Sequence, residues 1–507
     1  MTFSSLVFIC IFLPIVFILH CAIPHTKVRN ALLVVASLLF YAFGEPVYVI
    51  LMIASAFMNY LSAILIDRVN RKLFLIVAVI LNIGTLSVFK YAGFAVTTVN
   101  NLLGSNLTVP VIALPIGISF FTFQALSYVI DVYRGQVDVQ KNFGKVLLYI
   151  SFFPQLIAGP IVKYRDIELE INERTISVDE IAPGLRRFIV GLAKKVLIAN
   201  SMAVVADNVF NSSVSDLNII VAWIGALAYV MQIYFDFSGY SDMAIGLGRM
   251  FGFHFRENFN HPYISTNVKE FWRRWHISLS SWFKDYVYIP LGGNRKGKLR
   301  TAINKIIVFF LTGLWHGANW TFVVWGLFHG LFSFIEEYIP SIKKLPKVIG
   351  HIYLMVVVTV GFAIFRADNL SYAGGFIAKM FTGFDFSAEY MSLALRQMTP
   401  WFIVIFVAAI ICMGTFEKLV KEIYCDEATL ADGTAEAIEG IGEGADGTAE
   451  AIEGSGEGAD DSKIVVGTSV LRNVLNAALY VVAVMLLIWC ILRLSSGSYN
   501  PFIYFRF

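Results

Sequence analysis

The sequence IIVFFLTGLWHGANWTFVVWGLFHGLFSF fills residues 306–334 and decides the class of fold. It contains no Asp, Glu, Lys or Arg, and a helix needs only about 20 apolar residues to cross roughly 30 Å of hydrocarbon. Two histidines nevertheless stand inside it, His316 and His329. A titratable side chain at membrane depth is a candidate functional group by default, because placing it there is costly.

Apolar stretches of this kind recur along almost the whole chain of 507 residues, of which 57% are hydrophobic. One soluble core cannot bury that much apolar surface. Because lipid leaves backbone polar groups unsatisfied, we predict an all-α membrane protein with about ten to twelve transmembrane helices. The first, Leu6 to Ile23, lacks the basic start and the small-residue end of a signal peptide, so we expect it to be retained.

The net charge of +3 hides a strong asymmetry. Residues 422–462 carry thirteen acidic and no basic side chains, which leaves +16 on the rest of the chain. By the positive-inside rule, that excess belongs to cytoplasmic loops rather than to a nucleic-acid partner, and the uncharged residues 97–110 face outward. This pattern predicts that both termini lie outside the cytoplasm.

A tandem repeat occupies the acidic segment, with ADGTAEAIEGIGEG at 431–444 and ADGTAEAIEGSGEG at 445–458. Its Gly, Ala and acidic content cannot bury enough surface to fold, so we expect a disordered cytoplasmic loop over 425–463. A docking site for a basic partner is the alternative; calcium binding lacks the EF-hand spacing. The membrane domain then covers 1–424, and residues 464–507 supply a final transmembrane helix at about 474–492.

A second histidine, His276, stands in FWRRWHISLS at residues 271–280. An interfacial amphipathic helix accounts for the neighbouring Arg273, Arg274 and Trp275 without any chemistry. His276 itself could reach the same cavity as His316. In one unbroken helix, Trp320 shares a face with His316, whereas His329 is turned away by about 220°, so we expect His329 to be a structural, hydrogen-bonded residue.

A third polar feature is the series Gln232, Asp236 and Tyr240, spaced four residues apart in an apolar stretch. This spacing places them on one helix face, where they form either a proton or ion path or a hydrogen-bond network between helices.

The remaining motifs exclude several classes of chemistry. The loop GGNRKGKL at 292–299 ends in Leu299 where a P-loop needs a hydroxyl, so it is no nucleotidase, although its basic residues could contact phosphates of a cytoplasmic cofactor. The five cysteines lack metal or disulfide spacing, and we expect no metal site.

Together these segments resemble the membrane-bound O-acyltransferase (MBOAT) family, in its bacterial branch for alginate O-acetylation and teichoic-acid D-alanylation. The resemblance covers about residues 110–335, and the matching segments are FFPQLIAGPI (152–161), YFDFSGYSDMAIG (234–246), NFNHPY (258–263), residues 271–291 and residues 313–330.

The resemblance implies a ring of helices around a thinned centre in a bacterial cytoplasmic membrane. It implies catalysis by His316, with His276 as its companion and with Trp315 and Asn319 in the same motif as His316. The donor would be acetyl-CoA or an acyl-carrier thioester on the cytoplasmic side, with no tightly bound cofactor. The acceptor would be a cell-envelope polymer, reached through a secreted or membrane-anchored SGNH-type transferase.

The last six residues, FIYFRF, are similar to the terminal hexapeptide of the small partner protein in D-alanylation systems, whose tyrosine is proposed to carry the acyl group. The resemblance therefore makes Tyr504 a candidate acyl carrier, with an aromatic interfacial anchor as the alternative. We predict a membrane O-acetyltransferase acting toward an envelope polysaccharide. The alternatives are D-alanyl transfer to teichoic acid, and a proton-coupled lipid or sugar transporter in which Asp236, His276 and His316 form the proton path.

Overall fold

The computed structural model describes residues 1–339, 341–342, 345–416, 461–497 and 499–501. Within these ranges every regular element is a helix. Six helical segments are long and apolar enough to cross a membrane: α3 (Tyr48–Arg68), α4 (Arg71–Leu103), α9 with α10 (Val178–Phe210), α11 (Ile219–Met250), α16 (Lys347–Arg366) and Ala477–Ser495 of α22 (Asp461–Ser495).

The pair α18 (Ala388–Gln397) and α19 (Pro400–Ile411), bent by 62°, provides a seventh if it counts as one span. The shorter helices are α1 (Leu13–Ala22), α2 (Thr26–Ala42), α5 (Ile118–Arg134), α6 (Phe143–Ser151), α7 (Phe153–Leu156), α8 (Tyr164–Asn172), α12 (Val268–Arg274), α13 (Ile277–Phe283), α14 (Lys298–His316), α15 (Trp320–Tyr338) and α17 (Leu370–Thr382). The prediction of a polytopic all-α membrane protein is confirmed, and the count of ten to twelve spans stays a prediction.

Two close helix contacts arrange the elements around the centre. Gly191 of α9 faces Gly239 of α11 so closely that a Cβ on Gly191 would lie 2.5 Å from the Gly239 carbonyl oxygen. Gly313 of α14 likewise lies against α15, where a Cβ would be 2.3 Å from the carbonyl oxygen of Phe322. Small residues let helix backbones approach in this way, and here they fix the position of α11 and of the end of α14.

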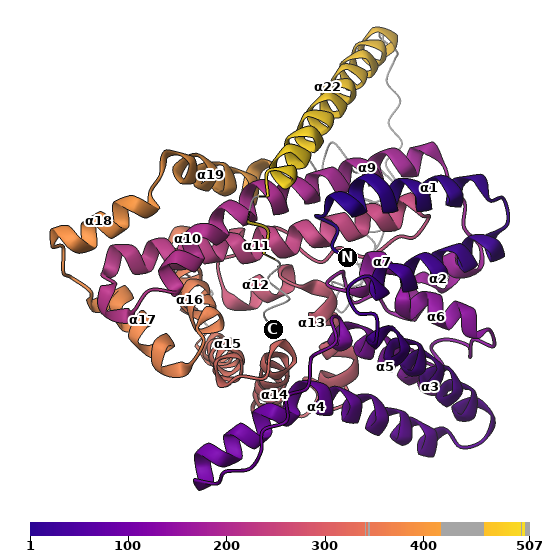
Figure 1. Ribbon diagram of the computed structural model, residues 1–507, viewed down its shortest axis with the longest axis horizontal. Coiled ribbons are helices and arrows are strands. Elements are labelled where there is room, and N and C mark those ends of the chain that lie inside the picture. The colour runs from indigo at the N-terminus through magenta and orange to yellow at the C-terminus, as the bar shows by residue number, and fades with distance from the viewer. Residues whose placement is uncertain (340, 343–344, 417–460, 498, 502–507) are drawn as a thin grey trace, which may run out of the picture.

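The short helices α12 and α13 lie in the middle of the molecule, surrounded by longer helices (Figure 1). Helix α22 extends away from the rest, and only 11% of its candidate span is buried. The expected acidic loop over 425–463 falls largely on residues 417–460, outside the described residues, and α22 already begins at Asp461.

The expectation of one unbroken helix through residues 306–334 is wrong. Helix α14 ends at His316, and α15 begins at Trp320 after a cap in which Asn319 Oδ1 accepts a hydrogen bond from the Thr321 amide, at 3.1 Å. A Cβ on the intervening Gly317 would lie 2.1 Å from the ring of Phe322, so only glycine fits there. The break turns α15 back against α14, and Trp320 is 46% exposed instead of sharing a face with His316.

Candidate functional site

His276 forms the corner between α12 and α13. Its backbone is left-handed, with φ 46° and ψ 54°, and His261 is the other non-glycine residue with positive φ in the described part of the chain. Such a conformation costs of the order of 1–3 kcal/mol and persists only where the surroundings hold it. The imidazole is buried, with its ring 4.5 Å from that of Phe237. The corner therefore aims the histidine into the interior, and residues 271–280 form the end of α12 and the start of α13 instead of one helix.

Asn258 holds this corner through four hydrogen bonds. Its backbone carbonyl accepts from the Ile277 amide at 2.9 Å. Its side-chain Oδ1 accepts from the Ser278 amide at 3.2 Å, from Ser278 Oγ at 2.9 Å and from His276 Nδ1 at 3.1 Å. Its amide group donates to Ser241 Oγ at 3.0 Å. Because the Ser278 N–H can only donate, Oδ1 is the acceptor and we assign the proton of His276 to Nδ1. Nε2 then carries a lone pair, and it is buried without a hydrogen-bond partner among the described residues.

His316 is the last residue of α14 and is 8% exposed. Its ring meets those of Trp315, Trp325 and Phe365 edge-on, at centroid distances of 5.0, 5.1 and 5.2 Å. Its Nδ1 is buried and has no hydrogen-bond partner in the described ranges. Buried polar atoms are normally paired, so an unpaired nitrogen on each imidazole marks this region as a candidate site.

The two histidines are neighbours, as the sequence suggested. The indole of Trp315 lies 5.0 Å from the His316 ring and 6.0 Å from the His276 ring, and the imidazoles are close enough to interact electrostatically. The structure thus brings His276, His316 and Trp315 together from α13 and α14, which are separate in the chain.

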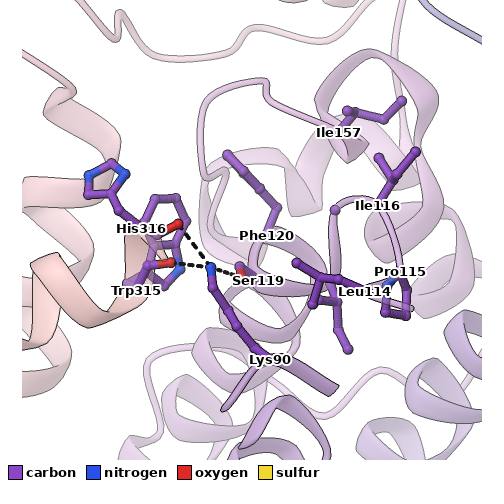
Figure 2. A pocket seen from close by; sticks show the side chains of 11 residues that line it. Lys90, Leu114, Pro115, Ile116, Ser119, Phe120, Ile157, Trp315 and His316 are labelled. Atoms are coloured by element: carbon purple, nitrogen blue, oxygen red, sulfur yellow. Dashed lines mark hydrogen bonds between the residues drawn. The ribbon is translucent and has the colours of Figure 1, made fainter. Parts of the chain in front are cut away.

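A pocket of about 220 Å³ reaches the end of α14, with Lys90, Trp315 and His316 on one side. The rest of its lining is Leu114, Pro115, Ile116, Gly117, Ile118, Ser119, Phe120 and Ile157. Figure 2 shows the imidazole of His316 turned away from Leu114 and Pro115, while its carbonyl faces Lys90. The pocket therefore meets the backbone at the end of α14, and the imidazole of His316 points away from Leu114 and Pro115.

Comparison with known proteins decides the family. The chain is 39% identical over 523 residues to the probable alginate O-acetylase of Azotobacter vinelandii, with both chains covered completely. The membrane-bound O-acyltransferase family model matches residues 136–366. The chain belongs to the membrane-bound O-acyltransferase family. It is therefore an O-acyltransferase, and the resemblance seen in the sequence is confirmed.

Two further relatives show how the likeness is distributed. The peptidoglycan O-acetyltransferase of Helicobacter pylori is 38% identical over 411 residues, which cover 73% of this chain and 78% of the relative. The teichoic acid D-alanyltransferase of Bacillus subtilis is 31% identical over 265 residues, or 49% of this chain and 67% of the relative. This acyltransferase is therefore similar to O-acetylating relatives over a much larger part of its length.

The polar series on α11 has partners other than the two histidines. Asp236 pairs with Lys195, with Nζ 2.6 Å from Oδ1 and both side chains almost fully buried. Tyr240 is buried against Phe3, with ring centroids 4.6 Å apart. The structure thus supports an interhelical network for this series, and membership of an acyltransferase family removes the main reason for a transporter.

The remaining predicted residues have structural surroundings. Arg273 is exposed, and Arg274 pairs with Glu270 in the same helix. Trp275 is buried, with its ring stacked 5.4 Å from that of Phe271. Asn319 caps α15 and also donates to the Asp368 carbonyl at 2.9 Å. Among the described residues, none of these four side chains forms a hydrogen bond or ring contact with an imidazole of the pair.

His329 is buried with its ring between those of Trp272 and Trp325, at 5.1 and 5.2 Å. Trp325 also touches His316, so the two histidines contact one indole. Its Nδ1 has no hydrogen-bond partner among the residues described. The prediction that His329 packs as a structural residue fits this environment, but the expected hydrogen bond at Nδ1 is not formed.

Sequence reasoning missed Asn258, Lys90 and Tyr91. Asn258 begins one of the matching motifs, and Lys90 is the single charge in residues 73–103, the long apolar part of α4, which is itself a signal for function. Among the described residues, no group of three or more His, Cys, Asp or Glu side chains is placed to hold a metal ion. Tyr504 lies outside the described residues.

Proposed function

We propose that this enzyme transfers an acetyl group from a cytoplasmic thioester toward hydroxyl groups of a cell-envelope or exported polysaccharide. The observation that carries the proposal is the pair of buried imidazoles, each with a ring nitrogen that has no partner among the described residues, of which His316 lines a pocket. The names of the relatives that match most of the chain support acetyl as the group transferred, whereas the D-alanyltransferase matches only half of it.

His316 acts as the general base. It takes the proton of the attacking hydroxyl while the hydroxyl oxygen bonds to the thioester carbonyl carbon. When the tetrahedral intermediate collapses, the carbon–sulfur bond breaks and the imidazolium returns the proton to the thiolate. Such proton transfer contributes about 10²- to 10⁴-fold in rate. The aromatic walls exclude water, which protects the thioester from hydrolysis.

His276 orients a substrate. In the neutral tautomer set by Asn258, its Nε2 has only a lone pair to offer, so it accepts a hydrogen bond and cannot donate one to a developing oxyanion. An N–H or O–H group of a bound substrate is the partner that this nitrogen requires. Orientation of a substrate therefore agrees better with the hydrogen bonds of His276 than stabilisation of an oxyanion does.

Tyr504 receives the acetyl group before a secreted SGNH-type transferase passes it to the polymer. Pro501, three residues earlier, is bound through its carbonyl to Lys195, which pairs with Asp236. Asp236 precedes Phe237, whose ring touches His276. Three extended residues span about 10 Å, so this anchor supports delivery of Tyr504 toward the histidine pair.

The test supplies labelled acetyl-CoA, or an acetylated acyl carrier, to the protein in liposomes. The wild type should consume one of these donors, and digestion followed by mass spectrometry should find an acetyl adduct on Tyr504. His316→Gln should discharge the donor about 10²- to 10⁴-fold more slowly. Wild-type discharge by folded His316→Gln would refute the base, and full polymer acetylation by Tyr504→Phe would refute the carrier alone.

A further inference from the structure

The carboxyl end of α14 leaves three consecutive carbonyl groups without partners in their own helix. Gly317 turns to an extended conformation, and its amide reaches back only to the carbonyl of Gly313, at 3.4 Å. The carbonyls of Leu314, Trp315 and His316 therefore need donors from elsewhere. In an apolar environment each unsatisfied carbonyl is costly, because no water replaces the missing donor.

Two consecutive residues of α4 satisfy all three carbonyls. The hydroxyl of Tyr91 donates to Leu314 O at 2.6 Å. The ammonium of Lys90 donates to Trp315 O at 2.5 Å and to His316 O at 3.2 Å. Figure 2 shows the ammonium between these carbonyls and Ser119. The contact joins segments more than 220 residues apart, so it fixes the end of α14 against a different part of the bundle.

The hydrogen bonds of Lys90 use all the donors of its ammonium group. Its third hydrogen bond goes to Ser119 Oγ at 3.3 Å, at the start of α5, so the three protons of the ammonium each have an acceptor. A cation with no free donor is poorly suited to bind a substrate carboxylate. A positive charge at the carboxyl end of a helix is favourable, because the aligned peptide dipoles place partial negative charge there.

We propose that Lys90 is a positioning residue for acyl transfer, whose ammonium fixes the last turn of α14 and thereby aims the imidazole of His316. The proposal rests on the proposed role of His316 as the base. His316 has no hydrogen bond at Nδ1 to orient its ring, so its orientation depends on where the backbone ends and on the aromatic rings around it. Lys90 holds that backbone through the carbonyl of His316 itself.

The experiment replaces Lys90 by Met, which keeps the length of the side chain and removes the charge. With folded protein in liposomes, the kcat for thioester discharge should fall about 10- to 100-fold, the loss expected from a displacement of about 1 Å at a reacting group. The KM for the donor should change little. Lys90→Arg should recover much of the rate, because it restores a cation that donates to the same carbonyls.

Two matched controls separate the charge from general damage to α4. Tyr91→Phe removes the cap on Leu314 and leaves the ammonium in place, so its effect should be smaller than that of Lys90→Met. Lys72→Met removes an exposed lysine at the start of the same helix and should leave the rate unchanged. If Lys90→Met does not fold, Lys90→Gln, which keeps two donors without the charge, must show the same loss of kcat.

Two readouts distinguish positioning from a structural role. In a His316→Ala background, Lys90→Met should cause no further loss of the residual rate, because residues that act through one another are not additive. The rate at which diethyl pyrocarbonate modifies His316, read by mass spectrometry, should differ between Lys90→Met and the wild type. This second readout does not depend on catalysis by His316, so it separates failure of this inference from failure of the proposed function.

Two outcomes would overturn the inference. One is a folded Lys90→Met, or its Gln replacement, with the wild-type kcat and unchanged modification of His316. The other is an equal, independent loss when Lys90→Met is added to His316→Ala.

Discussion

The corner at His276 and the helix end at His316 hold their imidazoles in different ways. Asn258 binds the ring of His276 directly, which sets the tautomer and leaves one defined lone pair. At His316 the protein binds the backbone through Lys90, and within the described residues the ring is confined by aromatic contacts. A ring with a fixed tautomer suits orientation of a substrate, whereas a ring without a hydrogen bond at Nδ1 is free to gain and lose a proton. The difference supports separate roles for two residues that look equivalent in the sequence.

The difference between the two imidazoles depends most on the amide of Asn258, which sets the tautomer of His276. Asn258→Leu removes the acceptor of the Nδ1 proton of His276 and leaves Ser278 Oγ, at 3.5 Å, as a weaker partner, so the ring should reorient and kcat should fall about 10- to 100-fold. The matched variant Ser241→Ala removes the acceptor of the Asn258 amide group and leaves the contact of Asn258 with His276 intact. It should lose only a few-fold in rate. Steady-state discharge of labelled donor measures both, and equal losses would show that Asn258 acts on the fold rather than on His276.

The sequence predicted the elements of this site better than their arrangement. A charge-free run that contains His316, and a second motif that contains His276, were enough to identify both histidines as candidates. The sequence did not predict the helix break at Gly317, because hydropathy does not reveal that a Cβ there would meet the ring of Phe322. Lys90 escaped for a related reason: its partners are carbonyls on a helix distant in sequence, and backbone groups leave no trace in side-chain patterns.

The segment before Tyr504, the proposed acetyl acceptor, is held by contacts of its own. The hydroxyl of Tyr499 donates to Asp207 at 2.7 Å, which fastens the segment before Tyr504. Removing a hydrogen bond to a charged group costs about 1.5–3 kcal/mol, so Tyr499→Phe should reduce acetylation of Tyr504 roughly tenfold, as counted by mass spectrometry.

Tyr480→Phe, the same substitution within α22, serves as the control for the tail and should retain the adduct. Undiminished acetylation of Tyr504 in Tyr499→Phe would show that this contact does not deliver the tail. Donor discharge by His316→Gln remains the separate test of the base.

His329 packs beside the site, and we expect it to take no part in the reaction. His329→Gln should keep kcat within about threefold of the wild type while lowering stability by about 1–3 kcal/mol, because it loses packing among Trp272, Trp325 and Phe328. The identical substitution at His316 should do the reverse, with a large loss of rate and a small change in thermal midpoint. A rate loss in His329→Gln as large as in His316→Gln would add a third histidine to the chemistry.

His254 lies outside the membrane-spanning helices. Its substitution tests the pH dependence of stability separately from the pH dependence of catalysis. Its Nδ1 lies 2.7 Å from Glu170 and its Nε2 lies 3.2 Å from Glu180, which also pairs with Arg249. The hydrogen bond to Glu170, with the charges of both carboxylates, raises the pKa of His254 above its ordinary value of 6.5. Burial of the side chain opposes this rise without cancelling it.

Because the pKa of His254 is higher in the folded state than in the unfolded state, its stabilisation is complete below about pH 6.5 and is lost as the pH rises through the folded value. His254→Gln should therefore lower the thermal midpoint at about pH 5.5 and have little effect at about pH 9. The side chain is 59% exposed, so solvent screening keeps the effect below about 1 kcal/mol. The pH–rate profile should be the same in both proteins, since His254 does not contact the histidine pair. A difference in thermal midpoint between the wild type and His254→Gln that grows as the pH rises would contradict the stabilising ion pairs. A pH–rate profile that shifts in His254→Gln would show that the titration of His254 contributes to the pH dependence of the rate.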